Sequence, residues 1–286
     1  ISLLDEIFTD PHPEVTMGIV VDSLGSGKIA ETAAAKKWQL HYENANTNLG
    51  SAGNLARRMT LAAETGAEWC LCLNHDASWD AARLSEMLSV ARSRSRVGAV
   101  YPMLDHSPRE PRWEDGRRHF RPSAGTRLYE VPQDEEAAEV LWSSSNSALY
   151  SLAPLSESIS VLSELWMGYE DLAYGIALHQ GNWIQLSCRS AVLTQVFDYV
   201  PRRILGRIVH IPDKPAWYYY YNLRNLLLIW RQYGSKGLTL RAICRKALQS
   251  GLRALLLEDN KFKRLQLLYL GAVAGLYGED GKGPYP

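Results

Sequence analysis

The first half of the chain alternates short apolar runs with amphipathic stretches, which is typical of strands and helices in turn. The apolar runs that predict strands lie at Val15–Val21, Trp38–Tyr42, Trp69–Leu73 and Val97–Tyr101. The amphipathic stretches that predict helices lie at Lys28–Lys37, Ala52–Glu64 and Ala81–Ala91. This alternation predicts an α/β fold with a mostly parallel sheet flanked by helices, whose ligands bind at the carboxyl ends of the strands.

The second half begins with polar sequence and ends in a long helical pattern. Residues 105–139 are rich in charged residues and prolines, which predicts an excursion over the surface. Further strands are predicted at Val140–Leu152, Trp183–Leu186 and Ala191–Phe197, and a helix in the second part of Leu162–Leu178. From Lys214 to about Leu276 the pattern is helical and predicts a C-terminal helical extension.

Composition changes this picture only through the distribution of charge. The 286 residues carry 31 basic and 31 acidic side chains, so a net charge of zero argues against an indiscriminate nucleic-acid binder. Between residues 201 and 264, however, fourteen Lys/Arg stand against three Asp/Glu. This basic segment is either a solvated helical face or a surface for anionic lipid head groups or a lipid-linked phosphate.

Apolar stripes within the basic segment favour a membrane surface over a spanning helix. They lie at Leu226–Trp230, Leu252–Leu257 and Leu265–Leu270, and each is too short to cross about 30 Å of hydrocarbon. The Trp217–Tyr221 cluster would supply rings at the interface. We expect these helices to lie on a membrane near a lipid-linked acceptor; the alternative is a homodimer interface made by the same helices.

The cysteines point to a reducing compartment. Cys70 and Cys72 alternate along an apolar run, and a CxC pair alone is a weak signal for a metal site. We expect these two, Cys188 and Cys244 to be buried free thiols. Without a signal peptide or a spanning segment, we expect a cytoplasmic protein that at most contacts the inner face of the cell membrane.

Two polar segments lie where the ends of predicted strands should converge. Asn48–Asn54 is a Gly/Asn turn that opens a helix, where small residues admit a ligand and the helix N-terminus offers N–H groups to an anion. A capped turn without a ligand would have the same composition. Asn74-His75-Asp76 follows the strand at Trp69–Leu73, and Asp76 suits a hard cation that bridges it to a diphosphate. His75 alternates away from Asp76, so we expect it in the core or behind the ligands.

A third segment places Glu170 and Asp171 at the start of an apolar helix, after Trp166 and Tyr169. Acidic residues in a first helical turn commonly interact with the helix dipole. The alternative is a general base beside an aromatic platform for a sugar ring, because a carboxylate can deprotonate a hydroxyl held against it.

Five motifs between Asp22 and Phe197 resemble, in order and spacing, those of glycosyltransferase family 2, the inverting enzymes of the GT-A fold. They are VVDSLGS at 20–26, NLGSAGN at 48–54, CLCLNHDAS at 70–78, WSSSNSALYS at 142–151 and GYEDLAYGIALHQGN at 168–182. Beyond them, YYYYNLRNLLLIWRQYG at 218–234 is similar to a segment of bacterial rhamnosyltransferase-like members. The sequence NLGSAGNLAR at 48–57 is also similar to galactofuranosyltransferases.

The resemblance implies a GT-A (Rossmann-like) domain that moves a sugar, with inversion, from a dTDP- or UDP-sugar to a hydroxyl of a glycan or lipid-linked acceptor. It implies a nucleotide-sugar-binding half at 1–100, an acceptor-binding half at 101–200 and a basic helical region at 201–286. In such enzymes a base deprotonates the acceptor while a metal and a helix dipole stabilise the leaving diphosphate. This activity would suit polysaccharide biosynthesis for the cell envelope.

The resemblance also implies a role for each candidate residue. Asp171 would be the catalytic base with Glu170 as its helper, and Asp76 would bind Mg²⁺ or Mn²⁺. The donor would be bound by Asp22, Ser23, Asn48, Gly50, Gly53, Asn54 and Asn74. The acceptor would be bound by Trp166, Tyr169 and Asn146.

Three departures from the family pattern favour an alternative function. The family's first strand has no counterpart, and Ile1–Phe8 resembles the helix that follows it, so we expect that strand to be missing from this sequence. The metal motif reads NHD, with one firm carboxylate, and Gln195 stands near the place of a histidine ligand, with His210 unassigned. The alternative is a GT-A-like module with little or no turnover that binds or scaffolds at a membrane surface.

Overall fold

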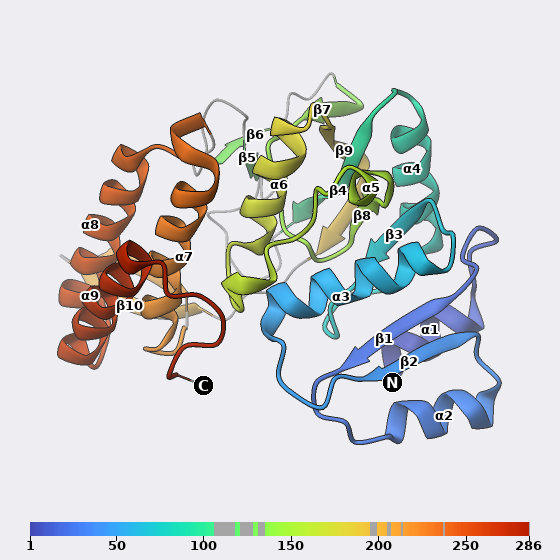
Figure 1. The fold of residues 1–286 in the computed structure, drawn as a ribbon, viewed down its shortest axis with the longest axis horizontal. Helices are drawn as coiled ribbons and strands as arrows, with labels where there is room; N and C mark the ends of the chain where they lie inside the picture. Colours follow the sequence, from blue (N-terminus) through green and yellow to red (C-terminus); the bar gives the residue numbers. More distant parts are fainter. Residues whose placement is uncertain are drawn as a thin grey trace.

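The computed structural model describes residues 1–105, 118–120, 128–130, 135–194, 199–204, 207–212, 214–236 and 238–285. Most of the excursion predicted at 105–139 lies outside these residues, as do Gln195 and Phe197. Two short strands of the excursion, β5 (Arg118–Phe120) and β6 (Leu128–Glu130), pair antiparallel. Figure 1 shows an α/β body on one side and a group of C-terminal helices on the other.

Five strands form the central sheet, in the order β3–β8–β4–β9–β7. Their bounds are Trp69–Cys72 for β3, Ala148–Ser151 for β8, Val97–Asp105 for β4, Ile184–Thr194 for β9 and Ala137–Glu139 for β7. β4 and β9 run parallel and the other neighbours antiparallel, so this sheet is mixed and the expectation of a mostly parallel sheet is wrong for it. The strands predicted at Trp183–Leu186 and Ala191–Phe197 are one strand, β9, because an irregularity in its pairing with β4 absorbs residues 189–191.

Helices cover both faces of this sheet. On one face, α4 (Ala81–Arg92) packs Leu84 and Leu88 against β4 and β9. On the other face, α3 (Gly50–Glu64) and α6 (Glu170–Gln180) pack against β4 and β8. The burial of one apolar stripe per helix is what the helical spacing in the sequence predicts.

Two further strands, β1 (Gly18–Asp22) and β2 (Leu40–Asn44), form a separate parallel pair. The short helices α1 (Ser2–Thr9) and α2 (Lys28–Lys36) lie beside this pair (Figure 1). Phe8 of α1 stacks on Trp38 with the ring centroids 5.2 Å apart. Helix α3 contacts both β1 and β3, so it joins this small two-stranded unit to the central sheet.

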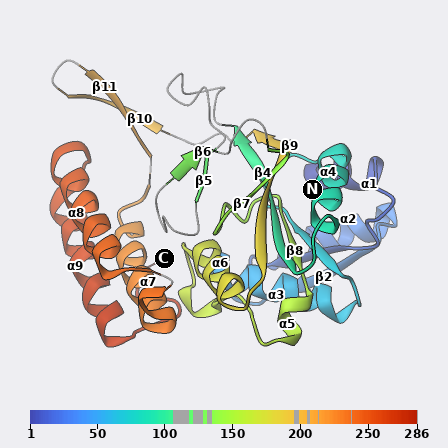
Figure 2. The same cartoon turned by 90° about the horizontal axis from the view of Figure 1, so that it is seen from above.

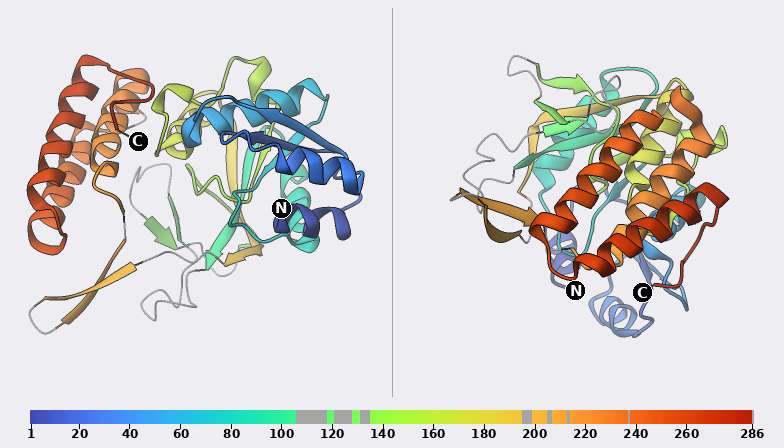
Figure 3. Two further views of the ribbon diagram at one scale, coloured as in Figure 1. Left: turned by 90° about the horizontal axis from the view of Figure 1, so that it is seen from below. Right: turned by 90° about the vertical axis from the view of Figure 1, so that its left-hand side faces the viewer.

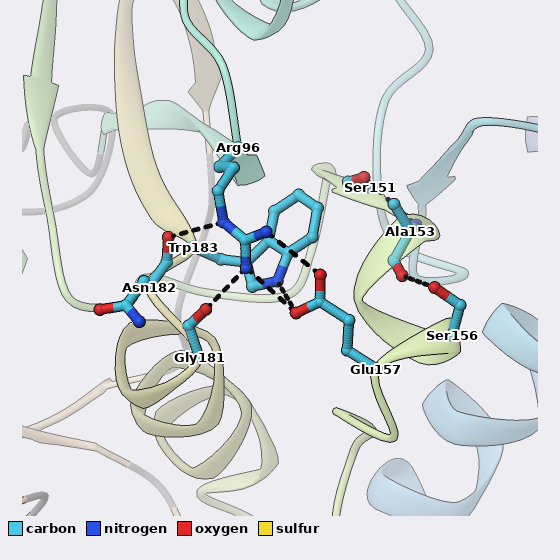
Figure 4. Close-up of polar contacts among 8 residues, drawn as sticks. All are labelled: Arg96, Ser151, Ala153, Ser156, Glu157, Gly181, Asn182 and Trp183. Carbon is cyan, nitrogen blue, oxygen red and sulfur yellow. Dashed lines mark hydrogen bonds and ion pairs between the residues drawn. The ribbon is translucent and has the colours of Figure 1, made fainter.

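Arg96, an exposed residue, fixes the entry into β4 (Figure 4). Arg96 donates to the carbonyls of Gly181 at 2.8 Å and Asn182 at 3.2 Å, and it pairs with Glu157. Its guanidinium lies 4.3 Å from the ring centroid of Trp183, whose Nε1 also donates to Glu157 at 3.0 Å. These contacts hold the end of α6 against α5 (Ala153–Ser156) and the start of β4.

The C-terminal region begins with a hairpin of β10 (Tyr199–Ile204) and β11 (Arg207–Pro212), which projects from the body (Figure 2). His210 lies in β11. Three helices follow: α7 (Tyr218–Tyr233), α8 (Leu240–Leu257) after a short 3-10 turn η3 (Gly234–Lys236), and α9 (Lys261–Tyr277). They agree with the helices predicted from Lys214 onward.

The structure corrects the expectation that the aromatic cluster and the first apolar stripe of this region face a membrane. Tyr219, Tyr220 and Tyr221 are buried, and so are Leu226 and Ile229. Side chains of α7 share one hydrophobic core with α6 and with the segment before it. The region 201–286 is therefore joined to the α/β body through α7, while α8 and α9 form the outer layer (Figure 3, right).

The cysteines are free thiols, as expected. Cys72 and Cys188 are buried and Cys70 is half-buried. Cys244 is exposed on α8, because it lies about a quarter turn around that helix from the face of the buried Ile243 and Ala254.

Candidate active site

A cavity of about 860 Å³ opens at the carboxyl ends of β1 and β3, where the starts of α3 and α6 also converge. Its walls are largely apolar, and a limited set of polar side chains lines it. Toward the ends of β1 and β3 these are Asp22, Ser23, Ser51, Asn54, Arg58, Asn74, His75, Ser145 and Glu170, and elsewhere in the lining they are Glu14, Thr16, Thr65, Glu68 and Arg92. Five predicted donor-binding positions, Asp22, Ser23, Gly50, Asn54 and Asn74, thus line one cavity with Glu170, one of the two predicted catalytic acids.

Asp22, at the end of β1, is held by its own turn. Its carboxylate accepts hydrogen bonds from the backbone N–H of Leu24 at 2.8 Å and from the hydroxyl of Tyr42 at 2.9 Å. Burial acts to raise the pKa of Asp22, but these hydrogen bonds and those from Gly25 and Ser26 outweigh it, so the pKa is lowered. The side chain is therefore a fixed anion at the mouth of the cavity.

The Gly/Asn turn closes onto the loop before α6. Gly50 has a φ of +67°, and a Cβ there would lie 2.0 Å from the carbonyl oxygen of Trp166. That oxygen accepts a hydrogen bond from Ala52 at 3.1 Å, and Asn48 accepts one from Gly50 at 2.9 Å. Gly50 lines the cavity, whereas Asn48 and Gly53 do not. Asn48 is exposed and closes an Asx turn ahead of α3, so this segment positions two loops as well as facing the cavity.

One turn of α3 carries the polar groups along the cavity floor. Asn54 donates through Nδ2 to the carbonyl of Val21 at 3.0 Å, and Arg58 donates to the carbonyl of Leu73 at 3.0 Å. Arg58 is a cavity residue that we did not predict from the sequence. Arg58 follows Asn54 by four residues, and residues four apart share a helix face, so this spacing could have predicted Arg58 as a neighbour of Asn54 in the site.

Of the three polar residues that follow β3, two line the cavity and one does not. Asn74 and His75 are exposed and line the cavity, so the expectation that His75 lies in the core is wrong. Asp76 is exposed in the following turn and is not part of the cavity lining. The backbone N–H of Asn74 donates to Oδ1 of Asn146 at 3.0 Å. Asn146 is 2% exposed, so its side chain supports this segment from beneath, away from any acceptor surface.

Glu170, which is buried, and Asp171, which is half-buried, form an acid pair in the first turn of α6. Glu170 lines the cavity, and its Oε2 has no hydrogen-bond partner among the described residues. Burial raises the pKa of Glu170. Burial also raises the pKa of Asp171, to about 8, and repulsion from Glu170 adds to the effect. Strongly raised carboxyl pKa values beside a cavity are typical of functional acids and bases.

Asp171 faces a group of tyrosines beyond the cavity lining. Its charge contributes to raising the pKa of Tyr101, Tyr169 and Tyr218, although burial is the largest cause for each. For Tyr218 the pKa is raised to about 12. Asp171 also accepts a hydrogen bond from Leu172 at 2.8 Å. Glu170 therefore lines the cavity and Asp171 does not, while Asp171 lies near tyrosines of β4, of the loop before α6 and of α7.

Trp166 and Tyr169 are not an open platform for a sugar. Trp166 is 4% exposed and packs against Tyr221, with ring centroids 4.8 Å apart. Its Nε1 donates to the carbonyl of Asn48 at 3.2 Å, so its ring braces the turn. Tyr169 is half-buried and donates its hydroxyl hydrogen to Asn222 at 3.1 Å. Both rings are occupied by the protein's own contacts, which sequence spacing alone did not reveal.

The loop that carries these aromatics is held by an Arg–Asn pair of α7. Asn225 donates through Nδ2 to the carbonyls of Leu165, Met167 and Gly168 at 2.8 to 3.0 Å. Arg224 donates to Leu165 at 2.8 Å and to Oδ1 of Asn225 at 3.0 Å. Both side chains are 0% exposed. Helix α7 therefore sets the path of the loop that leads into the acid pair.

These residues can hold a metal ion only if a second bound molecule supplies most of the atoms that coordinate it. No group of three or more His, Cys, Asp or Glu side chains that would hold a metal ion occurs among the described residues. Asp76 offers one exposed carboxylate and His75 one imidazole beside the cavity. Hard divalent cations commonly complete their shells with phosphate oxygens and water, so this donor set fits a cation that arrives with a diphosphate.

The comparisons with known proteins agree with this architecture. No protein-family model matches the chain, and no curated protein matches its sequence. Among solved structures, the chain resembles the mannosyltransferase PcManGT from Pyrobaculum calidifontis in complex with GDP-Man and Mn²⁺. The TM-score is 0.54 and the identity 14%, over 97% of this chain and 83% of that one.

Two other glycosyltransferases show the same likeness. GalNAc-T7 with UDP, GalNAc and Mn²⁺ matches with a TM-score of 0.58 and 10% identity, over 96% of this chain and 53% of that one. S. aureus TarS, residues 1–349, matches with a TM-score of 0.53 and 13% identity, over 96% of this chain and 75% of that one. The chain therefore has the GT-A glycosyltransferase fold, which confirms the predicted fold class.

Proposed function

We propose that this protein is an inverting, metal-dependent glycosyltransferase of family 2 that uses a nucleoside-diphosphate sugar. The observation that carries the proposal is the acid pair Glu170–Asp171, which the GT-A fold holds beside the cavity at the ends of β1 and β3. The solved structures of similar fold are glycosyltransferases, two of them crystallised with nucleotide and Mn²⁺, which supports the same substrate class here.

The donor is assigned to the cavity. Asp22 and Ser23 would contact the base and ribose, while Asn54, Arg58 and Asn74 would surround the diphosphate. Arg58 is the cation of this set, and a guanidinium recognises phosphate oxygens well. The first turn of α3, with Gly50 and Ser51 at the cavity wall, adds a positive helix end.

The acceptor is assigned to the side of the acid pair that faces Tyr218. Asp171, as its carboxylate, would take the proton of the acceptor hydroxyl. The acceptor oxygen would then attack the anomeric carbon and displace the nucleoside diphosphate in one step that inverts the configuration. Glu170 would orient the donor sugar from the cavity side. A carboxyl with a pKa near 8 is a suitable base close to neutral pH.

Mg²⁺ or Mn²⁺ would be held by Asp76 together with the donor diphosphate, where it would neutralise charge on the leaving group. Because Asp76 is exposed and alone, we expect the metal to bind measurably only when the nucleotide is present.

The outer helices carry the proposed membrane contact. No helix among the described residues has the length and apolarity to cross a bilayer. Large apolar side chains are nevertheless exposed along the outer face of α8 and α9. They are Leu248, Leu252, Leu255 and Leu256 on α8, and Phe262, Tyr269, Leu276 and Tyr277 on α9. Exposed Arg241, Lys261 and Lys263 accompany them, and this combination suits a peripheral surface for anionic lipid, near a lipid-linked glycan acceptor.

The function is tested by screening donors with the purified protein. Thermal shift and calorimetry with UDP-, dTDP- and GDP-sugars, each with and without Mn²⁺, should identify one nucleotide that binds only with metal. Release of the nucleoside diphosphate from that donor should follow, and Asp171→Asn should suppress release without weakening binding. Metal-dependent binding without any turnover, in wild type and variants alike, would instead support the alternative of a binding module.

A further inference from the structure

A group of basic side chains lies near the start of α7, outside the donor cavity. We call it the Tyr218 cluster, and it consists of Lys214 just before α7, Lys246 and Arg253 of α8, and Arg264 of α9. The ammonium of Lys214 lies 5.7 Å from the ring centroid of Tyr218. None of the four basic residues lines the donor cavity, so the cluster is separate from the diphosphate contacts assigned above.

Hydrogen bonds fix three members of the cluster relative to one another. Arg264 donates to the carbonyl of Lys214 at 3.0 Å and to Glu258 at 2.8 Å. Arg253 pairs with the same carboxylate and donates to the hydroxyl of Tyr219 at 3.1 Å. Tyr219 in turn donates to Glu258 at 2.7 Å. One buried carboxylate therefore serves two arginines, and the group keeps a positive charge.

The two lysines of the cluster add further positive charge. Among the described residues, no carboxylate forms an ion pair with Lys214 or Lys246. Lys246 is half-buried and precedes Arg253 by seven residues, so both lie on one side of α8. Burial lowers the pKa of Lys246, and the charges of Arg253 and Arg245 add to the effect. An anion beside these side chains would offset their mutual repulsion.

Tyr218 connects the cluster with the acid pair. A Cβ at Gly168, two residues before Glu170, would lie 3.8 Å from Cε2 of Tyr218. Burial is the main cause of the raised pKa of Tyr218, the charges of Asp171 and Glu170 raise it further, and the charge of Arg253 opposes them. Tyr218 therefore lies within electrostatic reach of both the acids and Arg253. A ligand beside this half-buried ring would be near the proposed base and near the cations.

The position of the cluster on α8 favours a discrete ligand over a bilayer. Lys246 and Arg253 lie on the side of α8 opposite the exposed Leu248 and Leu255, as the helical repeat of 3.6 residues requires. A membrane that rests on those leucines would therefore not cover the cluster. Lysine and arginine side chains grouped in this way suit a phosphate, whose several oxygens accept charge-assisted hydrogen bonds.

We propose that the Tyr218 cluster binds a phosphate ester of the acceptor, so that the acceptor is a phosphorylated glycan or a glycan joined to its carrier through phosphate. The bound phosphate would hold the acceptor beside Tyr218, with the reacting hydroxyl at Asp171. The assignment of this phosphate to the acceptor rests on the proposed function, whereas binding of a phosphate ester to the cluster does not.

Binding of phosphate is tested without donor or turnover. Lysines of the purified protein are reductively methylated with ¹³C-formaldehyde, and their NMR signals are followed during titration with glycerol 1-phosphate. The signals of Lys214 and Lys246 should move. In Lys214→Met, the Kd read from the Lys246 signal should rise about fivefold, as expected for one lost charge contact. Lys37→Met, at an exposed lysine after α2, is the control and should leave that Kd unchanged.

Three outcomes of this titration would overturn the proposal. The first is an unchanged Kd in Lys214→Met. The second is an equal movement of the Lys37 signal, which would indicate unspecific attraction to any lysine. The third is tighter binding of glycerophosphoglycerol, the headgroup of phosphatidylglycerol, which would assign the cluster to a membrane surface instead.

Turnover then tests whether the phosphate belongs to the acceptor. A panel of octyl glycosides is compared with the matching octyl glycosyl phosphates. Lys214→Met should raise KM for the phosphorylated acceptor about fivefold and leave kcat and the KM for the donor unchanged. An equal rise for both members of a pair would refute the assignment to the acceptor. If glycerol 1-phosphate binds as expected but no acceptor is glycosylated, the phosphate site stands and the proposed function fails.

Discussion

Nδ2 of Asn225 lies 2.8 Å from the carbonyl oxygen of Gly168, two residues before Glu170. The bond joins the first C-terminal helix to the segment that aims the acid pair. Three residues of that segment, Trp166, Gly168 and Tyr169, have positive φ, a conformation that costs energy in the two aromatic residues and persists only under external restraint. Asn225 and Arg224 provide that restraint from α7.

Asn225→Ala should therefore reduce turnover although Asn225 is not in the cavity lining. The variant removes the Asn225 donor from the carbonyls of Met167 and Gly168, while the carbonyl of Leu165 keeps its bond from Arg224, and this should cost about 2 to 3 kcal/mol of unfolding free energy. We expect kcat to fall at least about tenfold while KM for the donor changes little. Gln249→Ala, at an exposed position of α8, is the control and should alter neither quantity. A stable Asn225→Ala variant with normal kcat would show that the loop holds its path unaided.

Gly50 allows a test of the contact between the turn and the same loop. Gly50→Ala places a methyl group against the carbonyl of Trp166 and also strains a left-handed φ, so we expect a loss above about 3 kcal/mol. Gly27→Ala is matched, because its φ is +72° and no atom lies near its added methyl group. It should lose only about 1 kcal/mol. Equal losses in urea unfolding would mean that the turn moves to accept the side chain.

Asp171→Asn should lower kcat about 100-fold or more, because the amide cannot accept the acceptor proton. Wild-type activity should rise with pH up to about 8, where Asp171 becomes ionised, and the residual activity of the variant should lose this step. A pH profile of kcat over pH 5 to 9 measures both. Wild-type turnover in the variant, with normal activity lost in Glu170→Gln, would move the role of base to Glu170.

The same variant should gain stability at alkaline pH. The pKa of Asp171 is raised in the folded protein above its value of about 4 in an unfolded chain, so the folded state binds the extra proton. Stability from this group is therefore lost as pH rises from about 4 to 8. Asp171→Asn should raise Tm by about 2 °C or more at pH 8 and by less at pH 5. A lower Tm at pH 8 would contradict the assigned shift.

Much of this fold was predictable because its helices and strands follow local patterns. Each of the predicted helices Ala52–Glu64 and Ala81–Ala91 appears within two residues of its expected ends, since one apolar stripe per helix is buried. The pairing of β3 with β8 was not predictable, because it joins residues about eighty positions apart and depends on tertiary contact. The excursion at 105–139 lies mostly outside the described residues, so its expected course stays a prediction.

The sequence predicts which residues at strand and helix ends line the candidate site, but it does not predict which aromatic residues are buried. Asp22, Asn74 and Glu170 line the cavity because strand and helix ends converge there, which topology alone indicates. Trp166 and Asn146 were expected at the acceptor and are buried supports instead. Sequence spacing does not reveal which face of a tryptophan is already covered, in this case by Tyr221.

Asp76→Asn should weaken Mn²⁺-dependent donor binding at least about tenfold, or about 1.4 kcal/mol, and leave the fold unchanged. Calorimetry with the donor, with and without EDTA, gives the comparison. Glu64→Gln removes another exposed carboxylate away from the cavity and should have no effect. If Asp76→Asn binds donor and metal as the wild type does, the metal ligand lies elsewhere.

The outer helices should bind anionic vesicles in a salt-dependent manner. Leu256→Ser with Phe262→Ser removes two side chains that are 70% and 90% exposed and should abolish co-sedimentation with vesicles that contain phosphatidylglycerol. Leu24→Ser, at a 92% exposed leucine in the turn after β1, is the control. Truncation near Pro212 is unsuitable as a test, because α7 belongs to the core. A stable dimer by light scattering, without vesicle binding, would assign this face to self-association.

The last residues of the chain pack against the loop that precedes α6. The carbonyl of Gly281 accepts a hydrogen bond from Arg224 at 2.8 Å, its N–H donates to Glu164, and Tyr285 packs on Tyr220. This strap reaches the same buried arginine that steadies residue 165. Cleavage of the polypeptide just after Gly278 would therefore weaken the contacts that hold the loop before Glu170 and Asp171. The cut would lie more than a hundred residues from these acids in the sequence and would not involve the cavity.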